Sequence, residues 1–230
     1  MSRHTMIAPP EEDPNAEIHC ASPPCFMHEL DPSWCGLPDW AEIRAWRRGE
    51  RARLIACRAA VPLAERRRRD QVITDHLLAA LQPDLAARHI GFYWPFKGEY
   101  DARPLARALH RQGVRFALPV VLQRAAPMVF RPWYPGIRLV PGIWDIPVPA
   151  EGEPVLPDTL LVPLVGFDPR GYRLGHGGGY YDRTLAAMAP RPRAIGIGFE
   201  SLRLTTIHPQ PHDIPMDVIV TENGVMEPGA

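Results

Sequence analysis

A strand, a glycine-rich loop and the start of a helix follow one another between residues 160 and 188. The apolar run Leu160–Phe167 has the length and composition of a strand that is buried on both faces. A turn-forming Asp-Pro-Arg-Gly and then a cluster of glycines come next: Gly175, Gly177, Gly178 and Gly179. Tyr180–Met188 is the helix that we expect to follow. This layout aims backbone N–H groups and the positive end of a helix at one point, which suits an anion.

The glycine cluster is not one of the familiar phosphate loops. No Gly-Lys-Ser/Thr follows it, so it is not a Walker A loop, and Tyr180 stands where a dinucleotide fingerprint needs glycine. A glycine turn that merely connects a strand to a helix is the alternative. We favour phosphate binding, because glycines leave room for a phosphate and because Arg173, His176 and Asp182 flank the loop. Asp182, in the first helical turn, can reach a cation held by that phosphate.

The N-terminal half begins with two predicted helices. Helical spacing of apolar residues starts near Asp39 and continues to Val61, and Ala64–Leu81 is a second amphipathic helix. Ten arginines fall between Arg44 and Arg69. Most of them fit an ordinary solvated face. Arginine also grips phosphate oxygens in a fork, so Arg47 and Arg51 are candidate ligand contacts.

The α/β part begins at Ile90. We expect a strand over Ile90–Trp94, a helix over Asp101–Arg111 and a strand over Val114–Leu122, which together form a parallel β-α-β unit. The segment of residues 95–100 lies at the carboxyl end of the first strand, where open α/β sheets bind ligands. The aromatic residues here are Trp94, which precedes the segment, and Phe96 and Tyr100 within it. They suit either a flat apolar wall of a ligand site, with Glu99 as its polar anchor, or the protein core.

The remaining predicted elements are short. Met128–Trp133, Ala194–Phe199 and Val218–Thr221 are expected strands, and Pro141–Pro149 is an ordered proline-rich loop that carries Trp144. Residues 208–217 hold two histidines and two aspartates among prolines. This segment fits a site of metal-type ligands as well as it fits a surface loop with an isolated His–Asp contact.

Composition limits the possible partners. The 230 residues contain 26 basic and 26 acidic side chains, so net charge does not favour nucleic acid or an anionic membrane. No apolar run approaches the ~20 residues that a bilayer requires, and the N-terminus has no secretion signal. We therefore expect a cytoplasmic protein with an extended N-terminal arm (residues 1–36) and a single domain (residues 37–230).

Four segments give the chain its resemblance to a known family. They are Val162–Arg183 (VPLVGFDPRGYRLGHGGGYYDR), Gly91–Leu105 (GFYWPFKGEYDARPL) and Pro211–Glu222 (PHDIPMDVIVTE), together with the PGIWDIPVP of residues 141–149. Across roughly residues 40 to 222 the sequence resembles the 5-formyltetrahydrofolate cyclo-ligase family, also called 5,10-methenyltetrahydrofolate synthetase. The resemblance implies a three-layer α/β/α sandwich with a mostly parallel open sheet, of the NagB/RpiA/CoA-transferase-like type.

The resemblance also implies a reaction. It is the Mg-ATP-dependent cyclisation of 5-formyltetrahydrofolate to 5,10-methenyltetrahydrofolate by a C–N bond-forming ligase, with release of ADP and phosphate. A formamide oxygen is a poor leaving group, so its phosphorylation by ATP would prepare the carbon for attack by N10 of the folate. Mg²⁺ and ATP are the implied cofactor and co-substrate, a folate is the implied partner, and a monomer without nucleic acid or membrane contacts is expected.

The family motifs imply a role for particular residues. Nucleotide contacts would come from Arg47, Arg51, Arg173, Leu174, Gly175, His176, Gly177, Gly178, Gly179, Tyr180 and Tyr181. Folate contacts would come from Trp94, Glu99, Trp144, His176, Gly177, Gly178, Gly179 and Tyr180. Glu99, Tyr180 and Asp182 would be the catalytic residues, and Asp182 and Asp217 the magnesium ligands. Asp182→Asn is expected to lower turnover and leave the fold intact.

The chain departs from the family pattern at two of these positions. Arg47 stands where the Lys-x₃-Arg nucleotide motif has lysine, and a fork replaces a point charge there. His176 stands where tyrosine or arginine is common, which adds a pH-sensitive group. A non-enzymatic ligand-binding paralogue and an RNA-binding module that uses residues 44–69 are competing hypotheses. The intact glycine loop with Glu99 speaks against the first, and the balanced charge against the second.

Overall fold

The computed structural model describes residues 40–82, 85 and 88–228. The predicted arm of residues 1–36 therefore lies outside the described residues. The helices are α1 (Trp40–Ala60), α2 (Leu63–Leu81), α3 (Arg103–His110) and α4 (Tyr180–Ala187), with short 3₁₀ turns η4 (Ile143–Asp145) and η5 (Glu200–Leu202). No described helix is long and apolar enough to cross a bilayer.

A seven-stranded sheet forms the centre of the molecule, in the order β11-β10-β9-β6-β1-β2-β3. Its strands are β1 (His89–Gly91), β2 (Arg115–Val120), β3 (Val129–Trp133), β6 (Thr159–Pro163), β9 (Arg193–Ile197), β10 (Val218–Thr221) and β11 (Gly224–Met226). The five inner strands are parallel, and β3 and β11 add an antiparallel strand at each edge. The predicted mostly parallel α/β sheet is confirmed.

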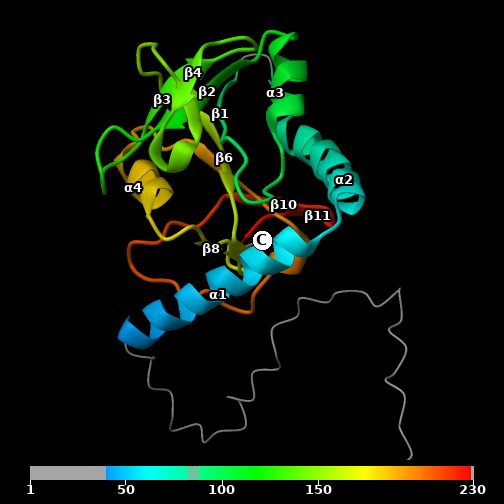
Figure 1. The fold of residues 1–230 in the computed structure, drawn as a ribbon, viewed down its shortest axis with the longest axis vertical. Coiled ribbons are helices and arrows are strands. Elements are labelled where there is room, and N and C mark those ends of the chain that lie inside the picture. Colours follow the sequence, from blue (N-terminus) through cyan, green and yellow to red (C-terminus); the bar gives the residue numbers. More distant parts are fainter. Residues whose placement is uncertain (1–39, 83–84, 86–87, 229–230) are drawn as a thin grey trace, which may run out of the picture.

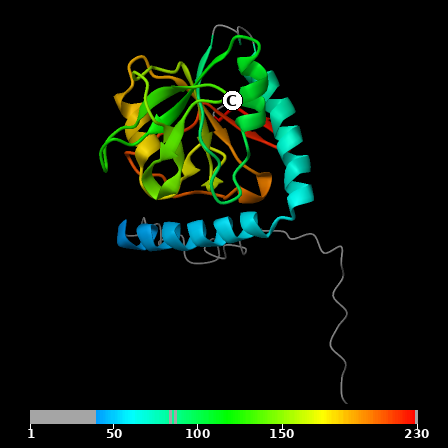
Figure 2. The same ribbon diagram turned by 45° about the horizontal axis from the view of Figure 1, so that its top comes forward.

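Helices cover both faces of this sheet. In Figures 1 and 2, α2 and α3 lie together on one side of the sheet and α4 lies on the other, while α1 crosses below it. One continuous core fills the space between the layers, built around β1, β6 and β9 with Ile90, Leu160 and Ile195 fully buried. The three-layer arrangement follows the prediction. The β1–α3–β2 unit also forms as predicted, with β1 and β2 parallel.

Strand order reverses between β1 and β6. From β1 the chain moves outward through β2 to β3, then returns to place β6 on the other side of β1 and continues outward through β9 to β10. The connections that leave the carboxyl ends of β1 and β6 therefore run to opposite faces of the sheet (Figure 1). A crevice forms at such a switch point in open α/β sheets, which makes it the usual ligand site.

Several predicted strands are shorter than expected. The predicted strand Leu160–Phe167 ends at Pro163, and Gly166–Phe167 (β7) instead pairs with Arg173–Leu174 (β8). The predicted strand Ile90–Trp94 keeps only its first residues in β1. The loop predicted over residues 141–149 is wrong in form. It is a hairpin of β4 (Leu139–Pro141) and β5 (Pro147–Pro149) with Trp144 in the turn η4 between them.

Candidate active site

A cavity of about 970 Å³ opens at the carboxyl ends of β1, β2 and β6. It thus lies at the point where the strand order reverses. Two walls that are far apart in the sequence face each other across it, the segment that follows β1 and the glycine loop that precedes α4. A volume of this size suits a cofactor-sized ligand.

Almost every residue that the sequence singled out lines this cavity. These are Arg47, Arg51, Trp94, Glu99, Trp144, Arg173, Leu174, Gly175, His176, Gly177, Gly178, Gly179, Tyr180, Tyr181 and Asp182. Asp217 does not belong to the lining: its carboxylate binds Arg191 at 2.8 Å and the N–H of Ala194 at 2.7 Å. Tyr100, which the sequence left open as wall or core, is core, with 1% of its surface exposed.

The glycine loop presents unpaired backbone donors. None of the N–H groups of residues 175–179 hydrogen-bonds to another described residue, and Gly177 and Gly178 are exposed. Gly177 and Gly179 have φ of 96° and 63°, in the region that a side chain disfavours. Gly179 is also the N-cap of α4, so the loop amides and the positive helix end lie together. This is the local geometry of an anion site.

Arginines surround the glycine loop. The Arg51 Nε donates to the carbonyl of Gly175 at 2.7 Å, and burial together with the nearby Arg47 charge lowers its pKa. Arg183 donates to the carbonyl of Gly178 and lies over the Tyr180 ring at 5.2 Å, while its buried Nε has no partner among the described residues. Sequence reasoning missed Arg183, although it directly follows the Tyr-Tyr-Asp of the loop motif.

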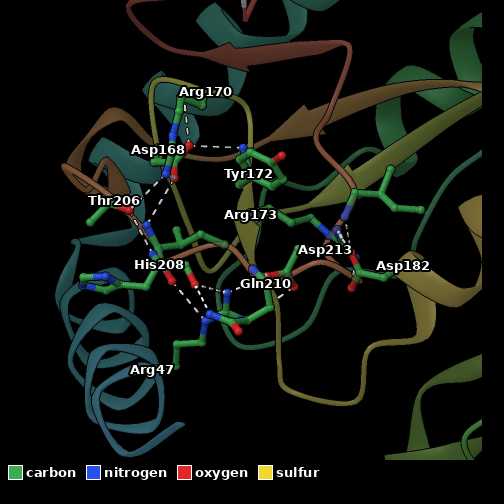
Figure 3. A network of polar contacts seen from close by, with 12 residues as sticks. Arg47, Asp168, Arg170, Tyr172, Arg173, Asp182, Thr206, His208, Gln210 and Asp213 are labelled. Atoms are coloured by element: carbon green, nitrogen blue, oxygen red, sulfur yellow. Dashed lines mark hydrogen bonds and ion pairs between the residues drawn. The ribbon is translucent and has the colours of Figure 1, made fainter. Parts of the chain in front are cut away.

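Arg47 lies in the same wall but its guanidinium is occupied. It donates to the carbonyls of Ile207 and His208 at 3.0 and 2.8 Å and binds the Asp213 carboxylate at 2.5 Å. The network in Figure 3 shows Arg47 pointing toward Asp213, Gln210 and His208. Only 6% of Arg47 is exposed. The segment of residues 208–217 is thus bound to α1 through the Arg47–Asp213 ion pair, and part of this segment lines the cavity.

Asp182 also has a protein partner. Its two oxygens bind the Arg173 guanidinium at 2.8 and 3.1 Å, and Oδ1 accepts the N–H of Ile214 at 3.1 Å. The pair is visible in Figure 3 beside Asp213. The part of the chain that the structure describes holds no group of three or more His, Cys, Asp or Glu side chains placed for a metal ion.

Glu99 and His176 meet across the cavity floor. The Glu99 Oε1 lies 2.8 Å from the His176 Nε2, and Oε2 accepts the N–H of Phe96 at 2.9 Å. Arg58, 2% exposed, lies 3.7 Å behind Glu99 and donates to the carbonyl of Leu164. The Glu99 side chain is 4% exposed, so His176 covers the anchor that the sequence assigned to a ligand.

Aromatic side chains from the segment after β1, the turn η4 and the start of α4 line the cavity. Trp144 stands edge-on to Tyr180 with ring centroids 6.0 Å apart, and Phe96 stands edge-on to His176 at 5.6 Å. Trp94 lines the cavity and carries Arg103 over its ring at 4.8 Å. Trp144 is 59% exposed, which is unusual for tryptophan and leaves its face open to a ligand.

Comparison with known proteins identifies the family. The model of the 5-formyltetrahydrofolate cyclo-ligase family matches residues 43–222. The chain belongs to the 5-formyltetrahydrofolate cyclo-ligase family. The 5-formyltetrahydrofolate cyclo-ligase of Escherichia coli K12 is 34% identical over 152 residues, which cover 63% of this chain and 84% of the relative. That of Mycolicibacterium smegmatis is 30% identical over 183 residues, which cover 74% and 91%.

Solved structures agree with the family. The 5,10-methenyltetrahydrofolate synthetase of Aquifex aeolicus superposes with a TM-score of 0.69 at 30% identity, covering 80% of this chain and 93% of its own. The Mycoplasma pneumoniae synthetase gives 0.63 at 26% identity, covering 76% and 98%. The family is one of ligases, so the chain is an enzyme, and the matched residues contain the cavity walls from Ile43 onward.

Proposed function

We propose that the protein converts 5-formyltetrahydrofolate to 5,10-methenyltetrahydrofolate with consumption of Mg-ATP and release of ADP and phosphate. Family membership supports the folate reaction. The observation that carries the ATP dependence is the glycine loop, whose unpaired amides face the cavity at the N-terminus of α4. Such a cradle suits a polyphosphate better than it suits an uncharged ligand.

The nucleotide phosphates would lie on the glycine loop. The N–H groups of residues 175–179 are the donors, and Arg51 and Arg183 supply positive charge on the two sides of the loop. Among the described residues, the hydrogen bonds of these two arginine side chains go to the backbone carbonyls of Gly175 and Gly178 and not to a carboxylate. Arg47 and Arg173 instead hold Asp213 and Asp182, so their part in nucleotide binding is to shape the wall.

A folate pterin would lie against the aromatic side chains of the cavity. Trp144, Tyr180 and Trp94 offer ring faces and edges there, and flat rings bind well against such surfaces. Glu99 is within reach only through His176, which covers it.

Asp182 fits a magnesium ion only in a limited way. Its Oδ2 accepts one hydrogen bond, so a lone pair is left for a cation that also binds phosphate oxygens and water. Mg²⁺ bound there would neutralise charge on the phosphates. Asp217 is outside the cavity lining and does not join this donor set. We retain Asp182 as the magnesium residue.

Alignment and charge stabilisation would supply the rate. The loop amides and Arg51 stabilise the charge that develops as the formyl oxygen takes the terminal phosphoryl group from ATP. The aromatic side chains would hold the folate so that N10 reaches the activated carbon.

The test is an assay of the purified full chain with 5-formyltetrahydrofolate, ATP and Mg²⁺. We expect the near-ultraviolet absorbance of the methenyl product to grow together with equal amounts of ADP and phosphate, and to stay flat when ATP is omitted. Absence of product from a protein that demonstrably binds both ATP and the folate would refute the proposal.

A further inference from the structure

The contact between His176 and Glu99 fixes which imidazole nitrogen carries hydrogen. The Glu99 carboxylate faces the Arg58 guanidinium at 3.7 Å and accepts the N–H of Phe96, so it is placed as a hydrogen-bond acceptor, and the 2.8 Å contact then needs a hydrogen on the His176 Nε2. The other nitrogen, Nδ1, then carries a lone pair. It makes no hydrogen bond to any described residue, and His176 lines the cavity. The result is a basic nitrogen held in one tautomer beside the ligand space.

The ring is also held in orientation. Phe96 packs edge-on against it at 5.6 Å, and Phe96 donates its own N–H to the second oxygen of Glu99. Histidine, carboxylate and backbone thus form one rigid unit. A carboxylate that binds one imidazole nitrogen orients the ring and stabilises the imidazolium that forms when the other nitrogen takes a proton.

The proposed reaction requires a proton acceptor at this point. When N10 attacks the activated formyl carbon, a C–N10 bond forms, the C–O bond to the phosphate breaks, and phosphate leaves with the former formyl oxygen. N10 carries one hydrogen before the attack and none in the methenyl product, so one proton must leave N10. Its acceptor has to stand in the cavity with an available lone pair.

We propose that the Nδ1 of His176 accepts the proton from N10 and that Glu99 acts as the positioning residue behind it. This inference rests on the function proposed above. The other charged groups around the ring are Arg58 behind Glu99, Arg51 on α1, which binds the neighbouring Gly175, and Lys97 in the adjoining turn. Tyr93 and Tyr181 also face Glu99, and burial raises the pKa of both, so they stay neutral.

The decisive variant is His176→Gln. Its amide can still donate to Glu99 from the position of Nε2, but it has no basic nitrogen at the position of Nδ1. We expect kcat to fall on the order of 100-fold, a typical loss for a general base, with little change in the dissociation constants of ATP and folate. The acidic limb of the kcat–pH profile, where acid protonates the ring before the attack, should disappear.

Two further measurements separate a proton acceptor from a merely structural residue. In His176→Ala, added imidazole should restore part of the lost kcat, because it can occupy the vacated space and accept the proton. In His176→Gln, exchange of an isotope between the bridging and non-bridging oxygens of ATP should continue in the presence of folate, because phosphoryl transfer precedes the step that has lost its base.

The control is His212→Ala. His212 also lines the cavity, but its ring packs against Trp40 at 5.9 Å and does not contact Glu99. This variant should retain the acidic limb. The inference is overturned if His176→Gln keeps the wild-type kcat and pH profile, or if kcat falls with the acidic limb intact and no rescue by imidazole. An inactive wild-type protein would instead overturn the proposed function itself.

Discussion

Arg47 and Arg51 are four residues apart on α1 and differ in their partners. Arg47 is paired with Asp213 and with two carbonyls, whereas Arg51 makes one hydrogen bond, to Gly175, and has terminal nitrogens directed at the glycine loop. The Lys-x₃-Arg resemblance assigned both to the nucleotide. No sequence pattern reveals that Asp213, far along the chain, neutralises the first of them. The partners of an arginine are set by tertiary contacts.

Asp182→Asn is expected to destabilise the fold, in contrast to the expectation from sequence that it would leave the fold intact. The substitution leaves the Arg173 guanidinium, 4% exposed, without its counter-charge. Breaking a buried pair costs about 3 kcal/mol, which for a domain of this size lowers Tm by roughly 6–12 °C. Thermal melts of Asp182→Asn test the predicted loss. Melts of Arg173→Met, of Asp182→Leu and of the double variant Arg173→Met/Asp182→Leu give the coupling energy between the two side chains. Additive losses would show that the pair does not stabilise the fold.

Asp70 makes stability depend on pH. Burial, with the Asp101 charge next, raises its pKa to about 6, and its Oδ1 is buried without a partner. Because the folded state holds this proton more tightly than the unfolded chain does, the contribution of Asp70 to the free energy of unfolding falls as pH rises from about 4 to about 6 and then stays level. Since Asp70 is partly exposed, we expect this contribution to lower the free energy of unfolding by about 1 kcal/mol between the two pH values.

The variant Asp70→Asn lacks this titration, so it should be more stable than wild type at pH 8 and equal to it at pH 4. Urea unfolding at the two pH values measures the difference. The substitution Asp75→Asn in the same helix is the control. An Asp70→Asn variant whose unfolding free energy changes with pH as the wild type does would remove Asp70 as the cause.

At the scale of elements, α1 lines the cavity and also binds the segment of residues 207–213 through Arg47. Its buried residues Ile43, Arg47, Leu54 and Arg58 face the sheet layer, and two of these four are arginines. The sequence placed arginines on the solvent side of this helix, because hydropathy alone cannot distinguish an exposed arginine from one that is buried and paired. Arg58 binds three carbonyl oxygens, which explains how its charge is accommodated.

Arg47→Met should therefore mainly lower the stability of the fold, whereas Arg51→Met should mainly lower the affinity for ATP. The first leaves Asp213 and the carbonyls of Ile207 and His208 without donors, so we expect a stability loss of about 3 kcal/mol with a small change in ATP affinity. The second should weaken ATP binding more and stability less. Denaturant melts and ATP titrations of both variants test this. A strong affinity loss in Arg47→Met that Asp213→Leu does not relieve would assign Arg47 to the nucleotide.

Element existence was easier to predict than element length. The helices, the parallel β-α-β unit and the glycine loop before α4 follow from local periodicity and turn residues. Local periodicity does not show where a strand leaves the sheet, as β6 does at Pro163, nor that residues 141–149 pair as a hairpin. The strand β11 was missed although Asn223 and Gly224, residue types common in hairpin turns, stand at the turn that joins it to β10.

At the scale of the whole molecule, the site residues were predicted mainly from the family resemblance. The loop motif contributed Arg173 to Asp182, all of which line the cavity. Contacts that join distant segments were not predictable, since the Glu99–His176 and Arg47–Asp213 pairs link positions 77 and 166 residues apart. The metal role predicted for Asp217 from its place in a shared motif stays a prediction; in the structure its carboxylate binds Arg191 and does not line the cavity.

Removal of residues 1–36 should leave the enzyme intact. The described cavity lining begins at Trp40, and the family match begins at residue 43. We expect the shortened chain to keep the kcat and Tm of the full chain and to elute as a monomer, as we also expect of the full chain. Gel filtration, a thermal melt and the product assay test this. A large loss of folate affinity on truncation would show that the arm takes part in the site.

The reversal of strand order between β1 and β6 has a consequence for synthesis of the protein. One wall of the cavity comes from the segment after β1 and the other from the segment before α4. Asp213, the ion-pair partner of Arg47 in α1, comes still later in the chain. A nascent chain that has emerged only as far as β3 contains neither the glycine loop nor Asp213. The active site should therefore form only after nearly the whole polypeptide has left the ribosome. Fragments released earlier should bind neither ATP nor the folate.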